Sequence, residues 1–429
     1  MKITVSLNKD QYLRIFGPAS LLVTKGEIRI LGASFTQNSR VIISKFRSYC
    51  IKAVTESEID VFLGEGALIQ EPQPGEEVID RWEKAVNEVL DNLTKPGIIV
   101  IIGPVDSGKS SLTAMIANIA LSKGLKPAII DGDIGQADIG PPTFISLSII
   151  DRPILWLREL TYNKIRFVGT ITPSHVAHRV IAAIKSLVDE ALKQSDVVII
   201  DTDGWIYGSQ AIEYKIDLIR HVNPQALFMV GEEIKILSNT FRKYMQVKFL
   251  PSPKVMKKRD REERRILRCH AYKRYLEKST VRTLPLDMSI IIGSYILNGE
   301  PLNLNEDLLN KIKEAIGCNV VYASKLYEGS YAIVISGSRN RYVYEKLREV
   351  LNANEVFVLQ SGEEKGIISC VLNGKLEEVA PAIIEKIDYE KKVIYVRTPW
   401  QGEIGGLIIG KVKLNEQWEE ILRGDKCLL

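Results

Sequence analysis

The sequence predicts an α/β protein whose central domain, a mostly parallel sheet flanked by helices, is joined to a β-rich domain at either end of the chain. Three observations favour this fold class. An apolar, largely β-branched run at 98–102 precedes a glycine-rich loop and a helical stretch at 112–121. Strand-like and helical stretches then alternate as far as about residue 250, which is typical of a parallel sheet. Short apolar runs broken by turn residues dominate both ends of the chain.

Bulk composition limits the class of protein. The 429 residues are 45% hydrophobic and 26% charged, as in soluble globular proteins of two to four domains. The net charge of +4 gives no bulk attraction to nucleic acid, so any basic site must be local. No apolar run is long enough to span a membrane, and the first residues do not resemble a signal peptide. Five scattered cysteines without a Cys-x-x-Cys pair fit a reducing compartment, so we expect a cytoplasmic protein without a membrane partner.

Turn signals divide the chain into three predicted domains. Residues 1–75 alternate apolar runs and bends, with strands expected at 12–16, 20–23, 27–31 and 41–44. A loop rich in proline at 70–76 leads into a predicted amphipathic helix at 79–93, which opens the central domain, residues 76–284. Residues 285–429 contain more strand-like runs than helices and no catalytic constellation, so we expect a β-rich accessory domain there.

The central glycine-rich loop has the pattern Gly-x-x-x-x-Gly-Lys-Ser between a strand and a helix, which is the phosphate-binding P-loop. Its glycines allow successive backbone N–H groups to point at phosphate oxygens, and the following helix adds the positive end of its dipole. Lys109 is expected to reach the β- and γ-phosphates, and Ser110 to offer a hydroxyl to Mg²⁺. The predicted nucleotide-binding residues are Gly103, Pro104, Val105, Asp106, Ser107, Gly108, Lys109, Ser110 and Ser111.

Functional groups in open α/β sheets collect at the carboxyl ends of the strands, where three stretches of this chain are expected. Asp131 and Asp133 follow a buried strand and suit Mg²⁺ binding or activation of a hydroxyl, although an acidic turn has the same pattern. The stretch 169–173 is a rigid turn. Asp201 ends an apolar strand in the manner of a Walker-B acid, and Trp205 beyond it is either a base-stacking residue or a core anchor.

An arginine-rich stretch at about 254–276 is the last candidate. Arg261, Arg264, Arg265 and Arg268 share one face of a predicted helix. A solvated helix laced with salt bridges has this pattern as well. In a chain with a P-loop, however, such arginines can form a lid that neutralises the charge of a transferred phosphoryl group.

Taken in order, these motifs resemble the polynucleotide 5′-hydroxyl kinases related to the kinase subunit of the mRNA 3′-end cleavage factor and to the pre-ribosomal RNA processing kinase. The resemblance rests on Gly-Pro-x-Asp-x-Gly-Lys-Ser at 103–110, Asp-x-Asp-x-Gly-Gln at 131–136, Thr-Pro at 172–173, Thr-x-Gly-Trp at 202–205 and the arginines at 259–268. The Pro-Pro ending at 141–142 looks closer to the ribosomal-RNA-processing and archaeal branches.

The resemblance implies transfer of the γ-phosphate of ATP or GTP to the 5′-hydroxyl end of RNA, or of DNA, in RNA processing. It assigns Mg²⁺ to Ser110 and Asp133, with Asp133 also accepting the hydroxyl proton. It places the terminal nucleotide against Gln136, Thr172, Pro173 and Trp205, and the lid arginines at Arg259, Arg264 and Arg268. The family often has Asn before the Thr-x-Gly-Trp threonine, where this chain has Asp201. The general base is therefore open among Asp131, Asp133 and Asp201.

Two other functions fit the same motifs. A P-loop GTPase or ATPase switch would use Asp201 as its switch acid, but no Asn-Lys-x-Asp guanine-reading motif is present, since Asn163-Lys164 is followed by Ile165-Arg166. A non-catalytic nucleotide-binding assembly subunit would use the flanking β-rich domains as docking surfaces. The set of Lys109, Ser110, Asp133 and Arg264 favours the kinase, for which the same domains are candidate surfaces for protein partners.

Overall fold

The computed structural model describes residues 1–255, 258–338 and 340–423, which form two compact units. The first comprises residues 1–166 and 172–268, and the second comprises residues 167–171 and 269–429. Helix α6 (Arg261–Leu276) runs from one unit into the other. The predicted boundaries at 75/76 and 284/285 remain predictions. Residues 256–257 of the predicted lid and 424–429 of the predicted third domain lie outside the described residues.

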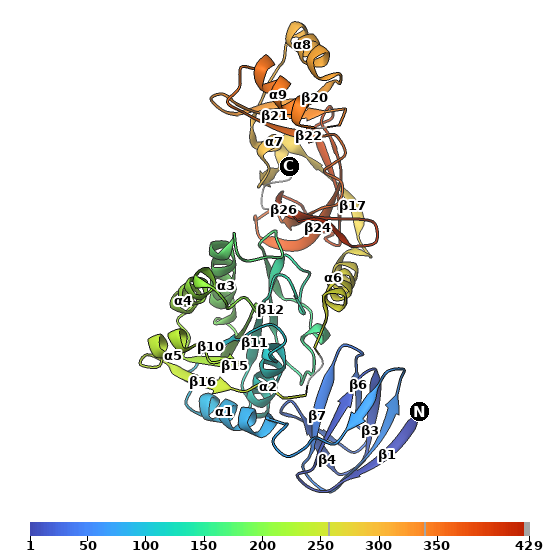
Figure 1. Ribbon diagram of the computed structural model, residues 1–429, viewed down its shortest axis with the longest axis vertical. Helices are drawn as coiled ribbons and strands as arrows, with labels where there is room; N and C mark the ends of the chain where they lie inside the picture. Colours follow the sequence, from blue (N-terminus) through green and yellow to red (C-terminus); the bar gives the residue numbers. More distant parts are fainter. Residues whose placement is uncertain (256–257, 339, 424–429) are drawn as a thin grey trace. The chain divides into compact units, whose positions relative to one another are not determined.

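The N-terminal part of the first unit consists of two antiparallel sheets (Figure 1). One has the order β1-β8-β3-β6, from Lys2–Leu7, Ser57–Leu63, Ala19–Lys25 and Arg40–Ile43. The other has the order β5-β4-β7-β2-β9, from Ala33–Thr36, Glu27–Ile30, Ser48–Ala53, Tyr12–Phe16 and Leu68–Gln70. Alternating burial along β3 and β4 shows why these short runs form strands, since one face enters the core and the other faces outward.

A seven-stranded sheet forms the centre of the first unit, in the order β13-β12-β11-β14-β10-β15-β16. Its strands are β10 (Gly97–Ile102), β11 (Pro127–Gly132), β12 (Phe144–Ile149), β13 (Lys164–Phe167), β14 (Val197–Thr202), β15 (Ala226–Val230) and β16 (Gln246–Leu250). The pairs of β10, β11, β14, β15 and β16 are parallel. The sequence analysis missed β12, which is antiparallel to β11 and directly follows the long acidic loop.

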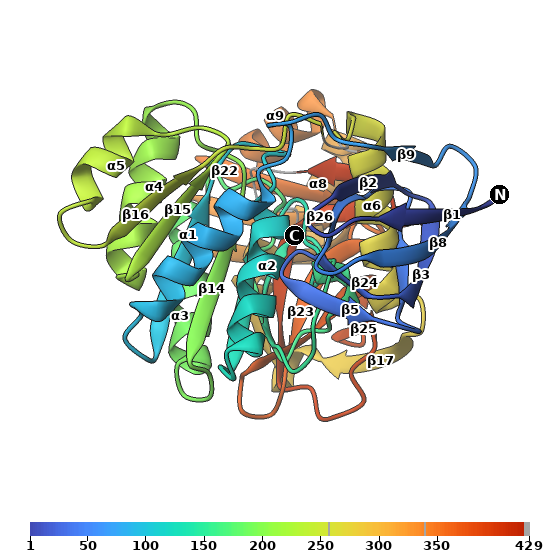
Figure 2. The same ribbon diagram turned by 90° about the horizontal axis from the view of Figure 1, so that it is seen from below.

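Helices cover both faces of this sheet, because right-handed crossovers in opposite directions place α2 and α4 on opposite sides. In Figure 2, α1 (Ile79–Asp91) lies beside α2 (Lys109–Ser122). Helix α3 (Ala177–Ala191) packs against α4 (Ser209–Val222), and the short α5 (Lys235–Phe241) precedes β16. A 3₁₀ turn, η1 (Leu157–Glu159), precedes β13.

The N-terminal sheets pack against α1 and α2. Leu31, Trp82, Met115 and Ile119 belong to one buried core, and the Asn118 side chain on α2 donates a 2.8 Å hydrogen bond to the Leu31 carbonyl oxygen. Residues of the first domain therefore lie close to the P-loop that precedes α2.

The second unit contains two further sheets. One has the order β17-β25-β24-β23-β26-β18, with β27 paired to β26, from Thr280–Pro285, Val393–Thr398, Glu378–Asp388, Ile367–Leu372, Gly406–Leu414, Ile290–Ile292 and Glu420–Arg423. The other has the order β19-β20-β21-β22, from Glu300–Pro301, Val320–Tyr327, Ser330–Ile335 and Glu355–Gln360. The remaining elements are η2 (Leu286–Met288), α7 (Tyr295–Asn298), α8 (Glu306–Ile316) and α9 (Arg341–Val350). No described helix is long and apolar enough to cross a membrane.

Candidate active site

The P-loop joins β10 to α2 and depends on two glycines. A Cβ at Gly103 would lie 2.3 Å from the Val230 carbonyl oxygen, and a Cβ at Gly108 would lie 2.8 Å from the Trp82 ring. Gly108 also has φ = 105°, a left-handed conformation that favours glycine. Helix α2 begins at Lys109, three residues before the predicted start at Leu112, so its N-terminus faces the loop.

Lys109 and Ser110 stand at the first turn of α2. Lys109 is buried, and its Nζ donates a 2.8 Å hydrogen bond to the Pro104 carbonyl oxygen across the loop. The Ser110 side chain lies near that of Asp201, at the end of β14, and lowers the pKa of the Asp201 carboxyl group. This proximity connects the P-loop hydroxyl to the acid that sequence analysis compared with a Walker-B residue.

Asp131 and Asp201 are neighbours in register on the parallel strands β11 and β14, and both are buried. Asp131 Oδ2 accepts hydrogen bonds from the backbone N–H groups of Asp138 and Ile139, at 2.7 and 2.9 Å. Burial and the nearby charges of Asp138 and Asp201 raise the Asp131 pKa well above its usual value. Asp131 therefore holds the acidic loop in place.

Burial raises the pKa of Asp201 to about 7, although Lys109 and the Ser110 side chain act in the opposite direction. Its Oδ1 is buried and has no hydrogen-bond partner among the residues that the structure describes. An unpartnered carboxylate oxygen beside a P-loop hydroxyl is suited to Mg²⁺, which takes one or two protein oxygens and completes its shell with phosphate and water. Within the described ranges, no cluster of three or more His, Cys, Asp or Glu could hold a metal by itself.

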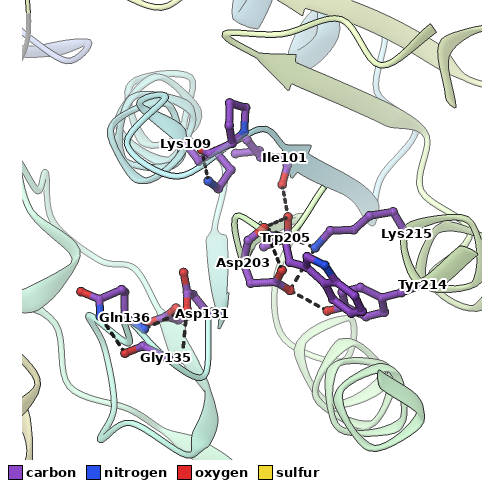
Figure 3. Close-up of polar contacts among 12 residues, drawn as sticks. Ile101, Lys109, Asp131, Gly135, Gln136, Asp203, Trp205, Tyr214 and Lys215 are labelled. Atoms are coloured by element: carbon purple, nitrogen blue, oxygen red, sulfur yellow. Dashed lines mark hydrogen bonds and ion pairs between the residues drawn. The ribbon is translucent and has the colours of Figure 1, made fainter. Parts of the chain in front are cut away.

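Asp133 is only partly buried. Its Oδ1 accepts hydrogen bonds from the backbone N–H groups of Gly135 and Gln136, at 3.0 and 2.8 Å. Burial and the charge of Asp203 raise the Asp133 pKa, while these hydrogen bonds and Lys109 oppose the shift. Figure 3 shows Asp131 near the end of β11 and Gln136 on the acidic loop that follows, across from Lys109.

Two predicted lid arginines meet the P-loop at Asp106, which adopts φ = 57°. Arg264 Nη2 lies 2.6 Å from Asp106 Oδ2, and Arg259 Nη2 lies 3.4 Å from Asp106 Oδ1. Arg264 belongs to α6, whereas Arg259 precedes this helix. Arg268 lies one turn further along α6 and is partly buried.

A cavity of about 130 Å³ brings most of these groups together. Of the predicted site residues, those that line it are Val105, Asp106, Ser107, Gly108, Lys109, Ser110, Ser111, Asp133, Gln136, Arg259 and Arg264. Asp131, Asp138, Asp201 and Thr202 line it as well. The N-terminal domain contributes residues that the sequence analysis did not connect with the site, including Arg14, Phe46, Arg47 and Tyr49.

Trp205 lines a different cavity, and no residue of the P-loop lines that cavity. This second cavity measures about 970 Å³ and is lined mainly by residues of α3 and α4, with Trp205 and Tyr214 among them. The described residues that line the first cavity do not include Trp205, Arg268, Thr172 or Pro173. Thr172 is exposed and Pro173 is half-buried, and neither lines the second cavity.

The turn that carries Trp205 nevertheless packs against the P-loop. A Cβ at Gly204 would lie 2.8 Å from the backbone nitrogen of Val105, so only glycine allows this approach. Asp203 in the same turn, and Tyr214 and Lys215 on α4, were not among the residues predicted from the sequence. A signal was present, because Lys215 occupies the helical face that Ala211, Leu218 and Val222 bury.

Comparisons with known proteins agree with this architecture. Residues 103–278 match the family model described as the mRNA cleavage and polyadenylation factor CLP1 P-loop. A polyribonucleotide 5′-hydroxyl-kinase of Pyrococcus abyssi is 30% identical over 338 residues, which cover 78% of this chain and 92% of that protein. One of Methanocaldococcus jannaschii is 28% identical over 348 residues, covering 80% and 93% of the two chains.

Among solved structures, the complex of Clp1p with Pcf11p has a chain of the same fold. It superposes with a TM-score of 0.64 at 13% identity, covering 96% of this chain and 98% of that one.

Proposed function

Because the chain belongs to the polyribonucleotide 5′-hydroxyl-kinase family, we propose that it transfers the γ-phosphate of ATP or GTP to the 5′-hydroxyl end of RNA. The observation that carries this proposal is the single cavity lined by Lys109, Asp133, Asp201, Arg259 and Arg264. Phosphoryl transfer needs a phosphate cradle, an acid near the acceptor hydroxyl, and cations near the transferred group. These three kinds of group line one space.

In the proposed complex, the P-loop N–H groups and Lys109 hold the β- and γ-phosphates. Ser110 and Asp201 hold Mg²⁺, which would supply positive charge to the phosphate oxygens. The resemblance assigned this ion to Ser110 and Asp133. Asp201 is the better partner for Ser110, because the Ser110 side chain acts on the Asp201 carboxyl group and Oδ1 of Asp201 has no hydrogen-bond partner among the described residues.

Asp133 then remains as the general base. Asp131 already accepts backbone hydrogen bonds on both of its oxygens, and Asp201 is assigned to Mg²⁺. Asp133 is partly exposed to the cavity, and its raised pKa makes it a more effective proton acceptor. As the 5′ oxygen bonds to the γ-phosphorus, its proton passes to Asp133 and the bond from the γ-phosphorus to the bridging oxygen breaks, leaving the nucleoside diphosphate.

Arg259 and Arg264 supply positive charge on the lid side. Asp106 holds both guanidinium groups at the P-loop, within the cavity that receives the phosphates. Charge at this place stabilises the transferred group as negative charge spreads over its oxygens. Arg268 is proposed as a third lid arginine on the family's pattern alone.

Phosphate transfer can be measured directly. The protein would be incubated with Mg²⁺ and γ-labelled ATP or GTP, together with a 5′-hydroxyl oligoribonucleotide or its deoxyribose counterpart. We expect label on the 5′-hydroxyl RNA and none on a matched RNA that already carries a 5′-phosphate. Absence of transfer from both nucleotides would refute the proposal, and nucleotide hydrolysis that is indifferent to RNA would support the switch instead.

A further inference from the structure

The carboxylate of Asp203, two residues before Trp205, accepts hydrogen bonds from three donors. Its Oδ1 accepts the backbone N–H of Trp205 at 2.9 Å. Its Oδ2 accepts the Tyr214 hydroxyl at 2.8 Å and the Lys215 Nζ at 3.0 Å. Figure 3 shows these side chains converging, with Lys215 and Tyr214 reaching Asp203 from helix α4.

The Asp203–Lys215 ion pair is almost fully enclosed, since the side chains are 5% and 0% exposed. A buried ion pair is an inefficient means of stabilising a fold, because the loss of hydration offsets much of the attraction. The effect of this pair is to orient side chains. It fixes the direction of a carboxylate that in turn fixes the backbone of the turn at 203–205.

The same network holds the Trp205 ring. The rings of Trp205 and Tyr214 stack with their centroids 5.8 Å apart and their planes 25° from parallel. The Tyr214 hydroxyl is itself held by Asp203. Both the backbone and the ring of Trp205 are therefore positioned through one carboxylate.

Residues of this network and its neighbour Thr202 line both of the cavities described above. Thr202 precedes Asp203 and lines the cavity that contains Lys109, whereas Trp205 and Tyr214 line the cavity formed by α3 and α4. The hydrogen bond of Lys109 and the ion pairs of Asp106 at the P-loop involve neither Tyr214 nor Lys215. We therefore expect a change at Tyr214 or Lys215 to affect the acceptor more than the nucleotide.

We propose that Asp203, Tyr214 and Lys215 are positioning residues that hold Trp205 ready to stack on the terminal base of the acceptor, an inference that rests on the proposed kinase function. Base–aromatic stacking contributes about 1–3 kcal/mol per base, but only when the ring is already held in place. Loss of the network would loosen the ring without removing it. The acceptor would then bind more weakly while nucleotide binding is unchanged.

Steady-state kinetics of Lys215→Met and Tyr214→Phe test this inference. We expect the KM for the 5′-hydroxyl oligonucleotide to rise about tenfold, from the loss of a buried charged hydrogen bond, with the KM for the nucleotide unchanged. Arg220→Met is the matched control, because Arg220 is an exposed cation of the same helix that pairs with Asp217. This control should retain the wild-type KM for both substrates.

A binding readout separates positioning from a general loss of structure. Addition of the oligonucleotide should quench tryptophan fluorescence in the wild type, less so in Lys215→Met and Tyr214→Phe, and least in Trp205→Phe. Melting temperatures would report folding, and if Lys215→Met does not fold, Tyr214→Phe removes one hydroxyl and still decides the question.

The outcomes distinguish the two proposals. If the wild type transfers no phosphate, the proposed function fails, whereas the fluorescence comparison still tests the network. If the wild type is active and Tyr214→Phe matches it in acceptor KM and in quenching, the positioning role is refuted. Equal rises in the KM for nucleotide and for acceptor would also refute it.

Discussion

Arg264 Nη2 lies 2.6 Å from Asp106 Oδ2, and this contact joins two segments that are 158 residues apart in the chain. It places an arginine of α6 at the loop that is proposed to hold the nucleotide phosphates. The contact also explains how a helix with many charges of both signs contributes to the site, since its neighbour Arg265 instead pairs with Glu262 on α6 itself.

Substitution of Arg264 should affect catalysis more than binding. We expect Arg264→Ala to lower kcat by about 10³-fold, as for arginines that neutralise a transferred phosphoryl group, with a much smaller change in nucleotide affinity. Kinetics and equilibrium nucleotide binding would be measured together. Arg265→Ala is the control on the same helix. A full loss of nucleotide binding in Arg264→Ala, with kcat retained at saturation, would contradict the proposed role.

Lys109→Ala should abolish measurable transfer, because it removes the side-chain cation that is proposed to hold the β- and γ-phosphates. The matched control is Lys123→Ala at the far end of α2, where the lysine pairs with Asp91. Label transfer under identical conditions compares the two. Wild-type activity in Lys109→Ala would remove the P-loop from the mechanism.

The assignment of Mg²⁺ to Asp201 predicts that substitutions at the two ends of β14 will have different effects on the Mg²⁺ requirement. Asp201→Asn should raise the Mg²⁺ concentration for half-maximal activity by at least about tenfold, since it removes a charged ligand. Asp196 immediately precedes β14 at its other end and accepts a hydrogen bond from the Lys126 backbone N–H, so Asp196→Asn is the control. Chelation of Mg²⁺ should stop transfer in both proteins. An unchanged Mg²⁺ requirement in Asp201→Asn would favour Asp133 as the ligand.

The lowered pKa of Asp138 predicts that its contribution to the free energy of unfolding depends on pH. Burial opposes its ionisation, but Arg158, Arg47 and Arg259 outweigh burial and lower the Asp138 pKa below its usual value. An acid whose pKa is lower in the folded state stabilises the fold above its unfolded pKa, and this contribution disappears as the pH falls through the folded pKa.

Asp138→Asn should therefore reduce the free energy of unfolding by about 3 kcal/mol at pH 7, because Arg158 loses a partner that lies 2.7 Å away. The difference from the wild type should shrink as the pH falls below about 3.8. Urea unfolding at several pH values measures it. A difference that is independent of pH would show that the ion pair is not its cause.

Much of the central domain follows from local sequence patterns. Strands β10 and β15 are apolar along their length, and the helix expected at 79–93 differs from α1 by two residues at its C-terminal end. Strand β12 was missed because it directly follows a loop rich in glycine and proline, and five N-terminal strands were missed because their runs are short or polar on alternate positions.

The P-loop, the acids at the ends of β11 and β14, and the arginines of α6 could be predicted from local sequence patterns. Each is a short pattern whose meaning depends on the elements directly before and after it. Three relationships became visible only in the folded chain: Asp106 pairs with Arg264, Arg47 of the first domain lines the same cavity, and Trp205 lines another. Those relationships arise from packing between distant segments, where burial and shape decide which charges meet, and local propensity carries no information about them.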